Sequence, residues 1–87
     1  MANIKSAMKR AEITQVRTKR NAAYKSMMKT AIRRFENALK AGDLEEAGVL
    51  LIKASRMIDK VETKGVIHKN TASRKKSRLA KALNRAS

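Results

Sequence analysis

The chain contains no proline, and its three glycines are the only strong helix breakers in 87 residues. Proline and glycine are the residues least tolerated inside a helix, whereas alanine, lysine, arginine, leucine and glutamate, which dominate this sequence, favour one. No segment shows the pattern typical of a strand. The sequence therefore predicts an all-α protein.

Two of the glycines stand where helices should stop. Gly42 is followed by Asp43, with Glu46 three residues further on. This is the pattern of a helix that ends at a C′ glycine directly before the capping box of the next one. Gly65 follows Lys64 in the same way. The predicted helices lie near residues 4–41, 43–64 and 66–86, and the turn at Gly65 should bring the last helix back beside the first.

Each predicted helix carries apolar residues at steps of three and four, the spacing of a buried face. Short turns make successive helices antiparallel neighbours, so the three faces can share one core. We expect a single domain, residues 1–87, folded as a three-helix bundle. The faces comprise Tyr24, Met28, Ala31, Phe35 and Ala38, widened by Ile32 and Leu39; Leu44, Ala47, Leu51, Ala54, Ile58 and Val61, beside Leu50 and Met57; and Val66, Ile67, Ala72, Leu79, Leu83 and Ala86.

The third glycine, Gly48, falls inside the middle helix, where it costs about 1 kcal/mol relative to alanine. We interpret it as a site of close contact between helices.

The first helix is too long for its partners. Nearly forty residues span roughly 57 Å at 1.5 Å per residue, and the other two helices cover about half of that. Residues 1–21 should therefore protrude from a bundle formed by residues 22–87. This overhang has six Lys or Arg against Glu12 and few large apolar side chains. We expect it to fray in the free protein and to become helical on a polyanion.

Charge divides the chain more sharply than hydrophobicity does. The formal net charge is +15, from 22 basic and 7 acidic residues. Residues 1–41 hold eleven basic and two acidic groups, 42–64 four and five, and 65–87 seven and none. Ordinary surfaces intersperse the two signs. The first and third helices therefore predict a polyanionic partner.

A membrane is the weaker candidate for that partner. No uncharged run is long enough to span a bilayer, and an interfacial helix needs more large aromatic residues than one phenylalanine and no tryptophan. The start, MANIKSAMKR, has no apolar signal region. It is amphipathic like an organellar transit peptide, but the same character continues far beyond any presequence, so we expect a cytosolic protein.

A structured nucleic acid is the stronger candidate. Both aromatic residues, Tyr24 and Phe35, lie on the predicted core face, which leaves nothing to stack on unpaired bases. Folded RNA or a duplex, gripped through phosphates and groove shape, is the expected target. An architectural protein of duplex DNA remains an alternative, and a cationic membrane-active peptide ranks third. The polar residues placed to donate to phosphate or 2′-hydroxyl oxygens are Asn21, Asn70, Ser26, Thr30 and Thr71.

Catalytic chemistry has no support in the sequence. The single histidine, His68, has no carboxylate nearby and is flanked by Lys69, and the chain has no cysteine. A general base and a zinc site therefore both lack their partners. Glycine-rich phosphate loops are absent as well. We expect no enzyme activity, cofactor, metal or small-molecule substrate.

Three ordered blocks carry a resemblance: ANIKSAMKR at 2–10, RNAAYKSMMKTAIRR at 20–34 and GVIHKNTASRKKSRLAKALN at 65–84. Together they resemble the S20 family of bacterial small-subunit ribosomal proteins. The resemblance implies a three-helix bundle with a protruding first helix, bound directly to 16S ribosomal RNA early in assembly, among other small-subunit components. In that family the protein bridges the 5′ domain and the long penultimate stem.

Carried over by position, the resemblance also implies a set of RNA-facing residues. Met8 and Glu12 depart from the basic pattern of the family, so we carry no contact onto them, and the middle helix is expected to serve only the bundle. The implied set is Asn3, Lys5, Ser6, Lys9, Arg10, Arg17, Arg20, Asn21, Lys25, Lys29, Arg33, His68, Lys69, Asn70, Arg74, Lys75 and Arg78.

Overall fold

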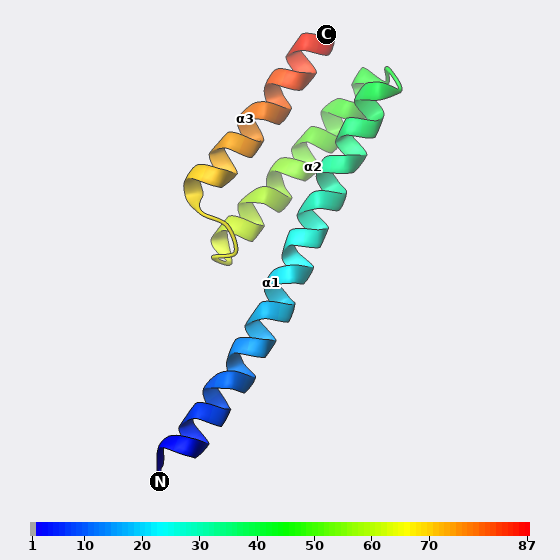
Figure 1. Cartoon of the computed structure of the whole chain (residues 1–87). Helices are drawn as coiled ribbons and strands as arrows, with labels where there is room; N and C mark the ends of the chain where they lie inside the picture. The colour runs from blue at the N-terminus through cyan, green and yellow to red at the C-terminus, as the bar shows by residue number, and fades with distance from the viewer. Residues whose placement is uncertain (1) are drawn as a thin grey trace.

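Three helices make up the fold. The structure, a computed structural model, describes residues 2–87 and the side chains from Ser6 onward. The helices are α1 (Ala2–Lys40), α2 (Leu44–Thr63) and α3 (Lys69–Ala86), and the described residues contain no strand. α1 and α3 run in one direction and α2 in the other, with half of α1 extending beyond the bundle (Figure 1). The predicted all-α three-helix bundle with a protruding first helix is confirmed.

The turn between α1 and α2 forms as the sequence predicts. Gly42 has a φ of 78°, a value that side chains disfavour. Its N–H donates to the carbonyl of Leu39 at 3.0 Å, and the N–H of Asp43 donates to that of Ala38 at 3.1 Å. These paired bonds are a Schellman motif, which satisfies the last carbonyls of α1. Asp43 Oδ1 then accepts from the N–H of Glu46 at 3.1 Å and caps α2.

The turn between α2 and α3 is longer than expected. Gly65 has a φ of 76°, and the N–H of Val66 donates to the carbonyl of Val61 at 3.1 Å, a second Schellman motif. The predicted start of the last helix at residue 66 was wrong, because α3 begins at Lys69. Val66 and Ile67 instead lie half-buried in the connection and pack against the core, which closes this end of the bundle.

The core draws residues from all three helices. Phe35, Ile58 and Val61 are its largest fully buried side chains. α2 packs against both other helices, whereas α1 and α3 approach each other less closely. The predicted faces are correct at their centres and fail at helix ends: Leu44 is 37% exposed and Ala86 is exposed, because little covers a terminal turn. The buried set is Met28, Phe35, Ala47, Ala54, Ile58, Val61, Ala72 and Leu79.

Gly48 does not mark a close helix contact. A Cβ built at this position would meet no atom within 4 Å. The interpretation of Gly48 as a packing residue was therefore wrong, and the half-buried position has room for a side chain.

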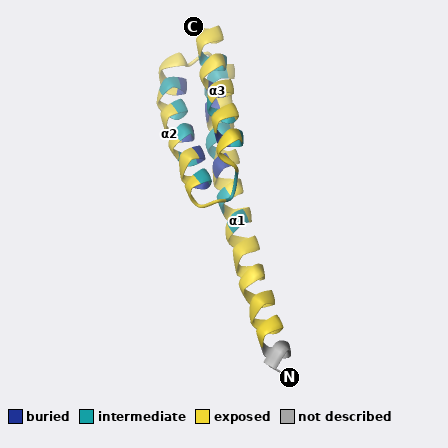
Figure 2. Cartoon of the chain, turned by 90° about the vertical axis from the view of Figure 1, so that its left-hand side faces the viewer, coloured by how far each residue is buried: buried dark blue, intermediate teal, exposed yellow. Residues whose placement is uncertain are grey.

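The overhang of α1 is exposed from Ser6 to Arg20. Every residue from 6 to 20 is exposed, and Asn21 is the first that is half-buried (Figure 2). The molecule measures 64 × 21 × 14 Å, with a radius of gyration of 17.6 Å. A compact domain of this length would have about 12 Å. The protein is therefore a rod with a bundle at one end.

The stability lost when a core residue is replaced should depend on how deeply its side chain is buried rather than on residue type. Ile58→Ala removes a fully buried side chain and should cost about 2–5 kcal/mol of the free energy of unfolding. Leu51→Ala, at a half-buried position of the same helix, is the matched control and should cost clearly less. Urea unfolding followed by circular dichroism measures both. An equal loss for the two variants would contradict the core described above.

The helix of the overhang should open far more readily than the bundle in free protein. Residues 6–20 bury no side chain, and an isolated helix of this length is marginal in water. Amide exchange should therefore be fast across residues 6–20 and slow around Phe35 and Ile58. Protection that is uniform along α1 in the free protein would refute this expectation.

Candidate nucleic-acid interface

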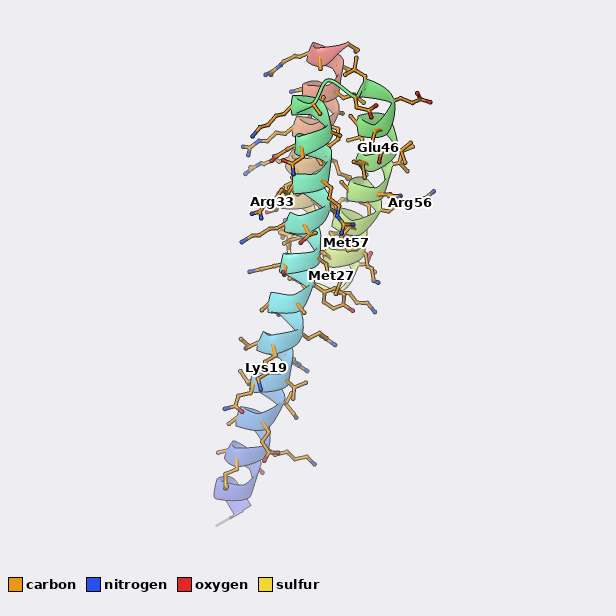
Figure 3. All side chains as sticks on the ribbon, turned by 90° about the vertical axis from the view of Figure 1, so that its right-hand side faces the viewer. Lys19, Met27, Arg33, Glu46, Arg56 and Met57 are labelled. Atoms are coloured by element: carbon orange, nitrogen blue, oxygen red, sulfur yellow. The ribbon has the colours of Figure 1, made fainter. Side chains whose placement is uncertain are left out.

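The bundle half of α1 carries a basic row on its exposed side. Lys25, Lys29 and Arg33 are spaced by four residues, which places them along one face of the helix, and all three are exposed. Arg33 points away from α2 (Figure 3). This row lies to one side of the apolar face that contacts α2, so its charges remain accessible to a partner.

The overhang half of α1 presents its charges in another direction. Ile13 and Ala31 are 18 residues apart, which is about five turns, so they lie on the same side of the helix. Ala31 packs on the core. Four of the five basic residues of the overhang whose side chains are described lie within about 60° of the line through Ile13, whereas Lys19 lies about 120° away. The four therefore face the side that α2 occupies further along the rod, and they are Lys9, Arg10, Arg17 and Arg20.

α3 adds a second basic row next to that of the bundle half of α1. Its exposed members follow steps of four, three and four: Arg74, Arg78, Lys81 and Arg85. A shallow groove of about 160 Å³ separates the two helices, lined by Lys75, Arg78 and Leu79 of α3 and by Ile32 and Glu36 of α1. The rows of α1 and α3 flank this groove, and together with Lys75 they form what we call the bundle surface.

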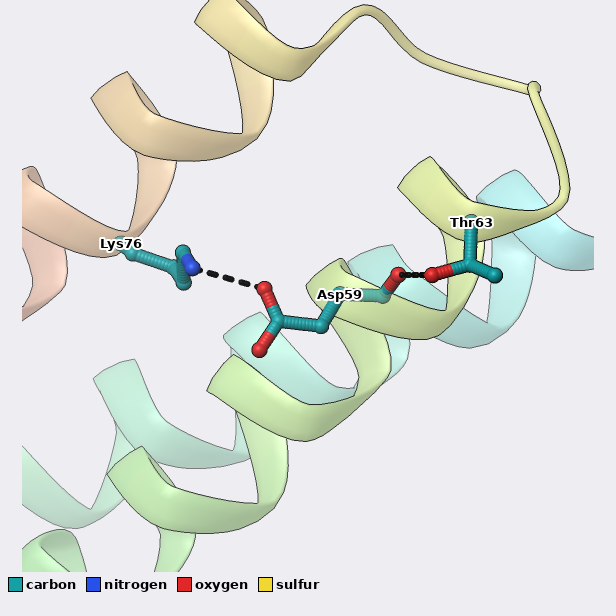
Figure 4. Close-up of polar contacts among 3 residues, drawn as sticks. All are labelled: Asp59, Thr63 and Lys76. Carbon is teal, nitrogen blue, oxygen red and sulfur yellow. Dashed lines mark hydrogen bonds and ion pairs between the residues drawn. The ribbon is translucent and has the colours of Figure 1, made fainter.

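One lysine of α3 is turned away from that surface. Lys76 Nζ lies 2.7 Å from Asp59 Oδ1 of α2, and Thr63 Oγ1 donates to the carbonyl of Asp59 at 2.8 Å (Figure 4). The Lys76 and Asp59 side chains are 38% and 58% exposed, so the pair contributes at most about 1 kcal/mol. It is the only ion pair within the described part of the chain. Lys76 therefore connects α3 to α2.

The structure sorts the predicted RNA-facing residues into three groups. The bundle surface brings together Lys25, Lys29, Arg33, Arg74, Lys75 and Arg78; the overhang holds Ser6, Lys9, Arg10, Arg17, Arg20 and Asn21; and the start of α3 holds His68, Lys69 and Asn70. Asn21 and Lys75 are half-buried and the others exposed. The side chains of Asn3 and Lys5 lie outside the described residues.

Two of the residues predicted to contact RNA already form hydrogen bonds with the backbone of their own helices. His68 Nδ1 accepts from the N–H of Asn70 at 3.1 Å, so His68 is the N-cap of α3. Thr30 Oγ1 donates to the carbonyl of Ser26 at 2.9 Å. Because the hydroxyl proton of Thr30 is engaged, donation to a phosphate would require breaking that bond.

The sequence analysis missed two cations of the bundle surface. Lys81 and Arg85 extend the row of Arg74 and Arg78 with the same spacing and are exposed. Helical spacing alone could have identified them.

The described residues offer neither a metal site nor a membrane span. No three His, Cys, Asp or Glu side chains among them are grouped so that they could hold a metal ion. None of their helices combines the length and the apolar character that a membrane-spanning segment needs.

Comparison with known proteins decides the family. The family model described as ribosomal protein S20 matches residues 2–84. The chain belongs to the ribosomal protein S20 family. Proteins of this family are structural components of the ribosome and not enzymes. The chain is therefore located in the cytoplasm, in the ribosome.

The curated relatives agree along nearly the full chain. A protein from Pelotomaculum thermopropionicum is 60% identical over 85 residues, which are 98% of this chain and 97% of the relative. Relatives from Desulforamulus reducens and Shouchella clausii are 59% and 54% identical over 97% and 96% of their own lengths, and over 98% and 97% of this chain. All three are named small ribosomal subunit protein bS20.

Proposed function

We propose that this ribosomal protein is a component of the small subunit that binds 16S ribosomal RNA directly and supports subunit assembly. The observation that carries the proposal is the uncompensated positive charge. Against a net charge of +15, the described residues form one ion pair, which occupies Lys76. Phosphates of a folded RNA would supply the missing counter-charge.

The two basic faces of α1 support contact with two separate RNA segments. The row from Lys25 to Arg33 and the overhang cluster around Ile13 are about 150° apart around the helix axis. A single straight duplex could not cover both. We assign these two faces to the two elements that the resemblance implies, the 5′ domain and the long penultimate stem of 16S RNA.

The two halves of the chain would have different roles in RNA binding. Residues 22–87 form a bundle that holds the α1 and α3 rows in fixed relation, because their apolar faces share one core. Residues 1–21 form an arm that gains its contacts only on the RNA. Ordering such an arm costs conformational entropy, so the arm would add specificity for correctly folded RNA more than it adds affinity.

Competition binding tests the proposal against its rivals. A filter-binding titration of the protein with refolded 16S RNA at near-physiological salt should give saturable one-to-one binding. That binding should persist in the presence of excess duplex DNA and unrelated structured RNA. Displacement by duplex DNA would favour an architectural DNA-binding role. Displacement by both competitors would leave a general polyanion binder.

Within the bundle surface, Lys75→Ala should weaken binding modestly and lower the slope of log K against log salt by about one, as loss of one phosphate contact would. Lys60→Ala is the matched control, because Lys60 is an exposed lysine of α2, outside the bundle surface, and should leave the slope unchanged. The measurement is the same titration over a salt series. An unchanged slope for Lys75→Ala would place Lys75 outside the interface.

A further inference from the structure

We propose that Ile13 and Val16 contact the ribose faces of an A-form RNA helix, so that the overhang recognises RNA by shape as well as by charge. The inference rests on the proposed function and deepens it. Neither residue belongs to the basic set implied by the family resemblance.

The two side chains form an exposed apolar strip among cations. Ile13 is 44% exposed and Val16 66% exposed, and no other helix reaches them. With Glu12, Arg17 and Arg20 they line a shallow groove along the helix. By helical spacing, Arg17 lies about 40° to one side of Ile13, and Val16 lies about 60° to the other. Arg20 falls between the directions of Ile13 and Val16, further along the helix, and Glu12 lies beyond Val16. The apolar strip therefore has positive charge on one side and at its end toward the bundle.

The direction of the strip places a partner beneath the bundle. Ile13 lies on the side of α1 that carries Ala31 and Phe35 against α2 further along the rod. The overhang projects past the turn between α2 and α3 (Figure 1). The strip and this turn, which carries the exposed Lys64 and His68, thus form the two walls of an open corner. The strip is flanked by Arg17 and Arg20 and the turn carries Lys64, so the corner is complementary to a nucleic-acid backbone.

Charge decides which occupant fits. A second copy of the chain would bring two overhangs of like charge together, with Arg17 and Arg20 of each facing those of the other, at an electrostatic cost. An RNA helix has the opposite sign. Its minor groove is wide and shallow and displays riboses and 2′-hydroxyls. Short branched side chains can touch the sugars there while the longer Arg17 and Arg20 reach nearby phosphates.

A double variant and a matched control test the assignment. Ile13→Gln with Val16→Gln removes the apolar contact, keeps every charge, and replaces two residues with a better helix former. Met8→Gln changes an apolar residue of the overhang that is about as exposed as Val16, at 63%, and that lies about 140° around the helix from Ile13 and 80° from Val16. Each protein is titrated with refolded 16S RNA over a salt series, with duplex DNA as competitor.

We expect the double variant to lose roughly tenfold in affinity for 16S RNA, with the salt slope unchanged, and to discriminate less against duplex DNA. Met8→Gln should bind like the parent protein. Selective binding by the parent with no loss in the double variant, or an equal loss in Met8→Gln, would overturn this inference alone. Failure of the parent to select 16S RNA would overturn the proposed function as well.

Sedimentation of the free protein tests the remaining occupant. The parent and the double variant should both sediment as monomers over the concentrations used for binding. A dimer of the parent that the double variant abolishes would assign the strip to a second copy of the chain, and the inference would be wrong.

Discussion

The structure depends on one mismatch of length, since α1 has 39 residues and the helices that cover it have 20 and 18. Only the half of α1 from Tyr24 onward can bury an apolar face, and Phe35 anchors that half in the core. The other half has no neighbour, so its side chains remain available to a partner. The rod shape and the two directions of positive charge both follow from this mismatch.

Electrostatic repulsion within the bundle is the second constraint, and α2 moderates it. The two strongly basic helices both pack on a segment, residues 42–64, that has four basic and five acidic residues. Asp59 of α2 holds Lys76 of α3, and the remaining cations are spread over exposed faces. A small apolar core must therefore hold the helices together against the repulsion between their positive charges. A bound polyanion would reduce that repulsion and stabilise the fold.

The same arrangement explains how a chain without aromatic stacking residues or catalytic groups can contribute to a ribosome. Its folded half presents a fixed pattern of charges, and its unsupported half offers a second pattern on the opposite side of one helix. Affinity would come mainly from phosphate contacts, which carry no sequence information. Under the proposals above, selectivity would come from geometry: from the spacing of the two faces and from the short apolar side chains Ile13 and Val16.

The sequence by itself determined the helices, the turns at Gly42 and Gly65, the centre of the core and the protrusion of α1, because helix propensity, capping and apolar spacing are local properties. Most members of the basic rows were named through the family resemblance, and helical spacing then places them on common faces. Only the tertiary structure decided that α3 starts at Lys69, that Gly48 has room for a side chain, and that Lys76 contacts α2 while Lys75 lines a groove. These features depend on which side chains meet across different helices, and no local pattern specifies those meetings.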